Sequence, residues 1–321
     1  MAGVDEEVRE GEELERALAS LRLEIRARFP AQRPEREPAG DSEWARLYTD
    51  LRRRFATLGM SERSGEVDEF GMDDVVVSRT RPALDLLFDR WFRVDLAGIE
   101  GLPERGPALL VANHSGLLPW DGLMLCHAVE RFHASGARPR FLVADWLITL
   151  PFVQPYLARL GGVRACRENA ERLLGSGHFV IAFPEGVKGA AKVFRERYRV
   201  KRFGRGGVVR VALETGAPLV PVGIVGAEEA HPLLFKWTTP ARAVGLPFVP
   251  VTPTFPLLGP LGGLPLPAKW VIRVGPPLPL GHLPPDAVSD ELLVSRLTEE
   301  LRSEVQALVD VALAERASVW G

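Results

Sequence analysis

The fold is decided by the stretch ALLVANHSGLLPWD, residues 108–121. Its first five residues are small or aliphatic and predict a buried strand, and polar side chains follow that strand directly. Similar apolar runs recur along the chain, separated by segments with helical periodicity. The predicted strands are Ala108–Ala112, Arg140–Ala144, Phe179–Phe183, Leu219–Val225 and Val271–Val274. This alternation predicts an α/β fold with a mainly parallel sheet flanked by helices.

Helices are predicted between and after these strands. Residues 121–134 and 205–215 have helical periodicity, and Gly216 suits the left-handed position that commonly ends a helix. Residues 289–316 predict a long amphipathic helix that packs on the domain. Its apolar stripe consists of Leu293, Leu297, Leu301, Val305, Leu308 and Ala312.

The chain before the sheet divides into two segments. Residues 1–41 carry eleven acidic and seven basic side chains and form a charged segment, with a short helix predicted over 7–28. Residues 42–95 predict an N-terminal helical segment of two amphipathic helices. The apolar stripes of these helices contain aromatic side chains and suit either a protein core or a membrane interface, and both alternatives stay open. The first stripe consists of Trp44, Leu47, Leu51 and Phe55, and the second of Leu84, Leu87, Phe88, Trp91 and Phe92. The α/β domain, with its C-terminal helix, is then expected over residues 96–321.

Composition restricts the class of protein. The chain has 321 residues, of which 46% are hydrophobic, so a sizeable core can form. A formal net charge of −2 gives no general reason to expect a nucleic acid partner. Two cysteines without a CxxC pair favour a reducing compartment. The polar N-terminus and the lack of a long apolar run predict neither a secretory signal nor a spanning helix, hence a cytoplasmic protein.

The first polar group after a strand contains His114 and Asp121. In α/β proteins the carboxyl ends of the strands present functional groups, so both side chains are expected at one sheet edge. A histidine can accept the proton of a hydroxyl, while a nearby carboxylate fixes its tautomer and stabilises the imidazolium.

The second polar group is FPEGVKG, residues 183–189, which follows the apolar run FVIAF. Gly186 lets the backbone turn tightly or approach a ligand. Glu185 and Lys188 are expected at the same sheet edge as the histidine. From Lys188 to Arg210 the chain holds nine Lys or Arg and one acid, which suits phosphate, anionic lipid, nucleic acid or simply solvent.

Several classes of enzyme lack support. No G-x-S-x-G turn is present for a serine hydrolase, and no HExxH or zinc-type spacing is present for a metalloenzyme. Neither GxxxxGK[ST] nor GxGxxG occurs for nucleotide binding. The sequence therefore predicts no metal and no bound cofactor.

Four blocks together resemble the glycerolphosphate and lysophosphatidic acid acyltransferase superfamily, whose domain is the phospholipid/glycerol acyltransferase domain. They are Asn113–Asp121, Gly161–Arg167, Phe183–Gly186 and Val220–Val222, and they occur in the family order. The sequence around these blocks is similar to bacterial relatives of the neutral-glyceride acyltransferases. The stretches that carry this similarity are RYRVKRFGRGG, LETGAPLVPVGIVGAEE and WVIRVGPPLPL.

The resemblance implies an enzyme that moves a fatty acyl group from acyl-CoA or acyl carrier protein to a hydroxyl of a glycerolipid or lysophospholipid. His114 would be the general base, Asp121 would orient it, and Pro221 would help to shape the pocket. The acyl thioester would be a co-substrate rather than a cofactor. A membrane surface is the expected partner, at the inner face of the membrane, and nucleic acid is not.

The resemblance also implies residues that bind substrate. Arg167 would bind a phosphate of the acceptor, with Arg164 as the alternative. Glu185 and Gly186 would position the acceptor, with Lys188 nearby.

The chain departs from the family pattern at two places. Six residues separate His114 from Asp121 where the family usually has four, and Cys166 stands where an aspartate usually precedes the arginine. These departures leave open an uncharged acceptor, such as an acylglycerol or another lipid alcohol. They also leave open a lipid-binding protein that keeps the fold without turnover.

One segment is unusual for a soluble domain. Residues 243–268 contain seven prolines and no charged side chain. Proline at this density excludes a helix and a central strand. The segment is expected either to plug into the core or to contact acyl chains or lipid headgroups. Residues 141–160 are a second candidate for an apolar channel.

Overall fold

The computed structural model describes residues 67–320, apart from 116–117, 149–152, 244–246, 279 and 281–282. The charged segment 1–41, with its predicted helix, and the first predicted helix of 42–95 lie outside the described residues.

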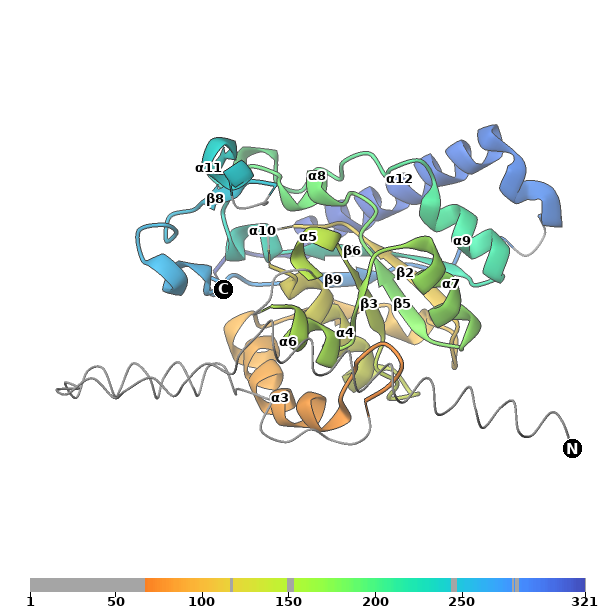
Figure 1. Cartoon of the computed structure of the whole chain (residues 1–321), viewed down its shortest axis with the longest axis horizontal. Coiled ribbons are helices and arrows are strands. Elements are labelled where there is room, and N and C mark those ends of the chain that lie inside the picture. Colours follow the sequence, from red (N-terminus) through yellow and green to blue (C-terminus); the bar gives the residue numbers. More distant parts are fainter. Residues whose placement is uncertain are drawn as a thin grey trace, which may run out of the picture. The chain divides into compact units, whose positions relative to one another are not determined.

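Among the described residues, seven strands form one mixed sheet in the order β1-β9-β6-β2-β5-β3-β4 (Figure 1). Only the β6–β9 pair is antiparallel within this sheet, and the other five pairs are parallel. The predicted mainly parallel α/β fold is therefore confirmed. The strands are β1 (Asp95–Ala97), β2 (Ala108–Ala112), β3 (Arg140–Val143), β4 (Gly162–Arg164), β5 (Phe179–Ala182), β6 (Leu219–Val225) and β9 (Val271–Val274).

The strand predictions hold where the strands are buried on both faces. All residues of β2, β5 and β6 are buried, which explains why each appears as a continuous apolar run. The predictions for β3 and β5 were one residue too long at the C-terminal end. The strands β1 and β4 were not predicted, because each has three residues and lies at an edge of the sheet.

One face of the sheet is covered by helices from the first half of the chain. They are α3 (Asp74–Leu86), its π-helical extension η1 (Leu87–Trp91), α4 (Trp120–Phe132), α5 (Asp145–Ile148) and α6 (Gln154–Arg159). Phe88, Phe92 and Met124 belong to the core beneath them. The core alternative is therefore correct for most of the second predicted stripe, although Trp91 is exposed.

The opposite face is covered by α7 (Arg167–Gly175), α9 (Gly207–Thr215) and α12 (Glu291–Glu315). The helix α9 ends at Gly216, whose φ of 68° is left-handed, as predicted. The helix α12 packs on β6 and β9, which confirms the expected docking of the C-terminal helix. Gly223 of β6 is needed for this approach, because an added Cβ would lie 2.7 Å from the Leu308 backbone.

Short elements connect these layers. They are η2 (Ile99–Gly101), α8 (Val187–Ala190), η3 (Phe194–Glu196), α10 (Ala227–Ala230), β7 (Phe235–Trp237), α11 (Thr238–Ala243), β8 (Val249–Val251), η4 (Gly259–Gly263) and η5 (Pro285–Ser289). The strands β7 and β8 form a separate antiparallel hairpin. Within the ranges described above, no helix combines the length and hydrophobicity that crossing a membrane requires.

The proline-rich segment 243–268 is buried at some positions and exposed at others. Phe248 and Ala268 are buried, whereas Leu257 and Leu261 are 85% and 67% exposed. Pro250 lies within the two-stranded hairpin rather than in the main sheet, as the density of prolines requires. The segment therefore packs against the protein on one side and presents apolar side chains on the other.

Candidate active site

The central pair of the site is His114 and Asp121. The His114 Nδ1 atom lies 2.6 Å from Asp121 Oδ2, so the six-residue loop does not keep the two side chains apart. A carboxylate can only accept a hydrogen bond, which places the ring proton on Nδ1 and leaves the Nε2 lone pair free to take a proton. The histidine side chain is 18% exposed and the aspartate is fully buried.

Two backbone N–H groups hold the side chain of Asp121. Its Oδ2 accepts the Ser115 N–H at 3.1 Å, and its Oδ1 accepts the Gly122 N–H at 2.8 Å. The residue lies in the first turn of α4, where the positive end of the helix dipole favours a negative charge. The carboxylate is thus fixed in place before any substrate binds.

Asn113 anchors the end of the strand that carries the histidine. Its side-chain amide donates to the Ile224 carbonyl at 2.8 Å, and its side-chain oxygen accepts the Ile224 N–H at 2.7 Å. The β2–β6 backbone pairing reaches Ala112 and Val222, so the asparagine side chain continues the ladder beyond it. No role of Asn113 was predicted, although its position between an apolar strand and the histidine was an available signal.

Glu185 lies beneath the histidine loop. Its Oε1 accepts the His114 backbone N–H at 2.8 Å and its Oε2 accepts the Lys201 N–H at 2.6 Å. The Glu185 side chain is fully buried. Its oxygens therefore bind protein groups, and they set the position of the His114 main chain.

Lys192 balances the charge of this carboxylate. Its ammonium group lies 3.5 Å from Glu185 and 2.9 Å from Glu228, and all three side chains are buried. Burial by itself would lower the pKa of Lys192, but the Glu228 and Glu185 carboxylates outweigh burial and raise it. Lys192 was not singled out from sequence, because it was one of nine cations in a basic run.

Close packing joins the two motifs at the sheet edge. The Phe183 ring lies 4.8 Å from the His114 ring, centroid to centroid. A Cβ added to Gly189 would lie 2.6 Å from Glu185 Cβ and 3.0 Å from His114 Cβ, so only glycine fits there. Gly186 has a φ of 54° and turns the chain from β5 into α8. Lys188 lies exposed on α8.

The two predicted phosphate-binding arginines have different surroundings. Arg164 makes two bonds of 2.8 Å to Asp145. Arg167 pairs with Glu171 at 2.6 Å and also with Glu214. Both side chains are exposed, and ion pairs of this kind are weak, so a phosphate could compete for either guanidinium.

A cationic cavity of about 390 Å³ adjoins the site on the side of α7 and α9. Arg167, Arg205 and Arg210 line it, and Cys166 and Phe183 contribute to its wall. The ring of Phe183 is therefore shared between this cavity and the histidine. Arg167 thus lies in a cavity that has Phe183 in common with the surroundings of His114.

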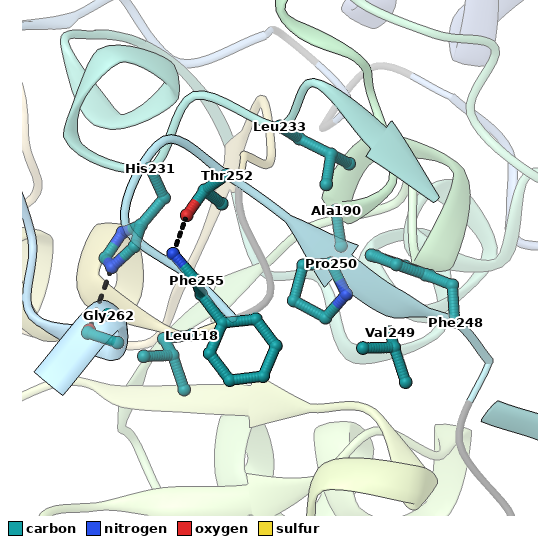
Figure 2. Close-up of a pocket in the computed structure, with 11 residues that line it drawn as sticks. Leu118, Ala190, His231, Leu233, Phe248, Val249, Pro250, Thr252, Phe255 and Gly262 are labelled. Atoms are coloured by element: carbon teal, nitrogen blue, oxygen red, sulfur yellow. Dashed lines mark hydrogen bonds between the residues drawn. The ribbon is translucent and has the colours of Figure 1, made fainter. Parts of the chain in front are cut away.

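An apolar cavity of about 260 Å³ lies on the side of the β7–β8 hairpin (Figure 2). Leu118 and Ala190 line it and connect it with the site, since Leu118 belongs to the histidine loop and Ala190 follows Gly189. Phe248 and Phe255 of the proline-rich segment form much of the wall. Of the two segments predicted to form an apolar channel, 243–268 therefore lines this cavity.

Pro221 is buried within β6, where its ring packs near Gly275. Within the described ranges, no group of three or more His, Cys, Asp or Glu side chains is arranged to hold a metal ion. The histidine, the carboxylates and the two cavities are what the site offers for chemistry. They suit general base catalysis between an apolar and a cationic binding region.

Residues 93–225 match the Acyltransferase family. An uncharacterized protein of Mycobacterium tuberculosis is 44% identical over 255 residues, which cover 79% of this chain and 71% of that protein. The chain belongs to the acyltransferase family.

More distant similarities extend to named proteins. A human protein named DGAT1/2-independent enzyme synthesizing storage lipids is 26% identical over 225 residues, covering 68% of this chain and 62% of that protein. The crystal structure of the 1-acyl-sn-glycerophosphate acyltransferase PlsC from Thermotoga maritima aligns with a TM-score of 0.47 and 19% identity, over 85% of this chain and 90% of that one.

Proposed function

We propose that this protein transfers a fatty acyl group from an acyl thioester, acyl-CoA or acyl carrier protein, to a hydroxyl of a glycerolipid or lysophospholipid. The observation that carries the proposal is the 2.6 Å contact between His114 and the buried carboxylate of Asp121. It leaves Nε2 as a base beside two cavities of different chemical character.

His114 acts as the general base. Its Nε2 removes the proton of the acceptor hydroxyl while the hydroxyl oxygen attacks the thioester carbonyl. The tetrahedral intermediate then collapses, the C–S bond breaks, and the protonated Nε2 returns its proton to the leaving thiolate. The products are an ester and a free thiol, and no acyl group is held on the protein. Asp121 stabilises the imidazolium that forms between the two proton transfers.

Glu185 acts as a positioning residue. Its bond to the His114 backbone N–H fixes the main chain that carries the base. A base held within a few tenths of an ångström of its working position is more effective than one on a loose loop. This role differs from direct contact with the acceptor, and Gly186 and Lys188 remain the better placed groups of that motif for such contact.

The apolar cavity receives the fatty chain. Its walls are aliphatic and aromatic, and it ends near the histidine loop. Desolvation of a hydrocarbon chain is favourable by about 0.8 kcal/mol per buried CH₂ group. A thioester whose chain fills this cavity has its carbonyl near the base.

The cationic cavity receives the phosphate-bearing part of a substrate. Arg167 and Arg205 are exposed at its mouth and can bind phosphate oxygens. Arg164 can bind the phosphate instead of Arg167 only if its ion pair with Asp145 breaks. A lipid substrate also implies that the protein works at a membrane surface, peripheral to the inner face.

Thiol release from palmitoyl-CoA tests this function. The acceptors are glycerol 3-phosphate, a lysophosphatidic acid, a monoacylglycerol and a diacylglycerol, each with wild type and with Arg167→Gln. We expect release that depends on an acceptor. For a phosphorylated acceptor the Arg167→Gln variant should raise KM, whereas an uncharged acceptor should show no change. If none of the four acceptors supports thiol release by the folded protein, the proposal is contradicted.

A further inference from the structure

A cluster of exposed apolar side chains lies on the β7–β8 hairpin and the loop that follows it. We call it the apolar tip. It consists of Leu234, Phe235, Trp237, Leu257, Leu261 and Leu264, each more than half exposed. In Figure 1 β8 and the loop after it lie at the opposite end of the sheet from α7 and α9.

Hydrogen bonds hold the apolar tip in a defined shape. Leu234 N–H donates to the Val251 carbonyl at 2.8 Å, which extends the hairpin by one bond beyond Phe235. The Thr254 hydroxyl donates to the Gly262 carbonyl at 3.1 Å and closes the loop. The Trp91 indole N–H donates to the Pro265 carbonyl at 3.0 Å and ties the loop to η1. The apolar side chains are thus presented by an ordered backbone.

The composition of the apolar tip fits lipid. Several large, exposed apolar side chains gathered on one hairpin and the loop that follows it are typical of a site that binds a membrane or a protein. Residues 243–268 contain no charged side chain that would keep the loop in water. Leucine, phenylalanine and tryptophan on irregular loops suit the boundary between lipid headgroups and acyl chains. A fluid bilayer, unlike a protein partner, requires no surface of complementary shape.

Basic side chains lie beside the apolar tip. The Phe194 N–H donates to the Leu233 carbonyl at 2.7 Å, which places η3 against the hairpin. The pKa of Glu196 in η3 is lowered by its bond to Lys201 and further by Lys236 and Arg195, so three cations surround one carboxylate. This excess of positive charge matches the negative surface of an anionic bilayer.

The apolar tip is continuous with the apolar cavity. Phe248, Pro250 and Phe255 line the cavity from the same hairpin and loop whose other side chains form the tip (Figure 2). His231 donates from Nε2 to the Gly263 carbonyl at 2.9 Å and holds the loop over the cavity. A lipid chain leaving a bilayer at the tip therefore meets the cavity wall within the same structural unit.

We propose that the apolar tip inserts into an anionic lipid bilayer, with the neighbouring Arg195, Lys201 and Lys236 against the lipid phosphates. This docking holds the apolar cavity at the membrane, where its lipid substrate is dissolved. The inference rests on the proposed function for the identity of that substrate, and its test does not depend on turnover.

The test is co-sedimentation of the full chain with vesicles of phosphatidylcholine, with and without phosphatidylglycerol. The variant carries Leu257→Asp and Leu261→Asp. The matched control carries Leu292→Asp and Val311→Asp on α12, where Leu292 is 84% exposed, nearly the same as Leu257. Each lost leucine should weaken binding about tenfold, so the tip variant should bind about 100-fold more weakly than wild type. The control should bind like wild type, and both should bind better to the anionic vesicles.

Equal binding of vesicles by wild type and the tip variant would overturn the inference. This holds also if the cause is that residues 1–66 attach the protein to the vesicle or cover the tip. No vesicle binding by wild type would overturn it too. A wild-type dimer that Leu257→Asp dissociates in sedimentation, without vesicle binding, would assign the tip to a second copy of the chain instead.

Turnover separates this inference from the proposed function. With a water-soluble short-chain thioester and acceptor, the tip variant should keep the wild-type rate. If vesicle binding depends on the tip but the protein shows no turnover, the proposed docking stands and the proposed acyltransferase function is refuted. Turnover without a difference in vesicle binding would refute the docking alone.

Discussion

Replacing Asp121 by asparagine keeps the shape of the side chain and removes its charge. In the wild type, Oδ2 lies 2.6 Å from His114 Nδ1 and accepts the Ser115 N–H at 3.1 Å, while Oδ1 accepts the Gly122 N–H at 2.8 Å. An amide has one acceptor oxygen and one NH₂ group. One of the two backbone N–H groups must therefore lose its partner in Asp121→Asn.

The distances decide which of the two bonds is lost. The shorter Gly122 bond keeps the amide oxygen at the Oδ1 position and turns the NH₂ group toward His114. That group donates to Nδ1, which forces the ring proton onto Nε2, the nitrogen that must accept the substrate proton. We expect kcat to fall by about 10²–10⁴-fold with KM little changed. The unpaired Ser115 N–H should lower the free energy of unfolding by about 1–3 kcal/mol.

The assay is steady-state thiol release, with urea unfolding of the same preparations. Asp85→Asn is the matched control, because Asp85 also bonds a histidine, His127 at 3.0 Å, on α3 and α4. The control should keep wild-type kcat. If Asp121→Asn, shown to be folded, keeps kcat within about tenfold of wild type, the role assigned to the pair is wrong.

Three further predictions concern charge, thiols and pH. Lys192→Met leaves the buried Glu185 and Glu228 carboxylates without their cation, so the free energy of unfolding should fall by about 3–5 kcal/mol; an unchanged urea midpoint would contradict the buried ion pair. Burial raises the pKa of Cys126 to about 12, whereas Cys166 is half-buried, so a thiol reagent should label Cys166 alone in native protein, as peptide mass spectrometry can show. Burial lowers the pKa of three histidines below 6.5, so the folded state binds fewer protons than the unfolded state and the thermal midpoint should fall as the pH drops below about 6.5. They are His127, His178 and His231. A midpoint that rises between pH 7 and 5.5 would refute this.

The centre of the fold was predictable because its strands are buried on both faces. The runs at Ala108–Ala112 and Leu219–Val225 are typical of such strands, and the structure has them with the same bounds. The edge strand Gly162–Arg164 escaped prediction, since three residues at a sheet edge leave no apolar run.

The contacts of the site were predictable between residues close together in the sequence, and unpredictable between residues far apart in it. His114 and Asp121 lie seven positions apart, and their residue types indicate a base and its partner. The surroundings of Glu185 depend on tertiary structure. Its cation Lys192 also pairs with Glu228, which α10 brings from a distant part of the sequence. Likewise, nothing in the sequence indicated that Arg164 would pair with Asp145.

The measurement that tests the central claim most directly follows an isotope-labelled palmitoyl group from CoA to product in wild type and in His114→Ala. Mass spectrometry of the lipid and of the intact protein reports both possible destinations of the label. The account predicts labelled ester from wild type, no labelled protein, and a rate at least about 100-fold lower in the variant. Labelled ester formed at equal rates by both proteins, or a labelled protein that passes its acyl group to the acceptor, would contradict it.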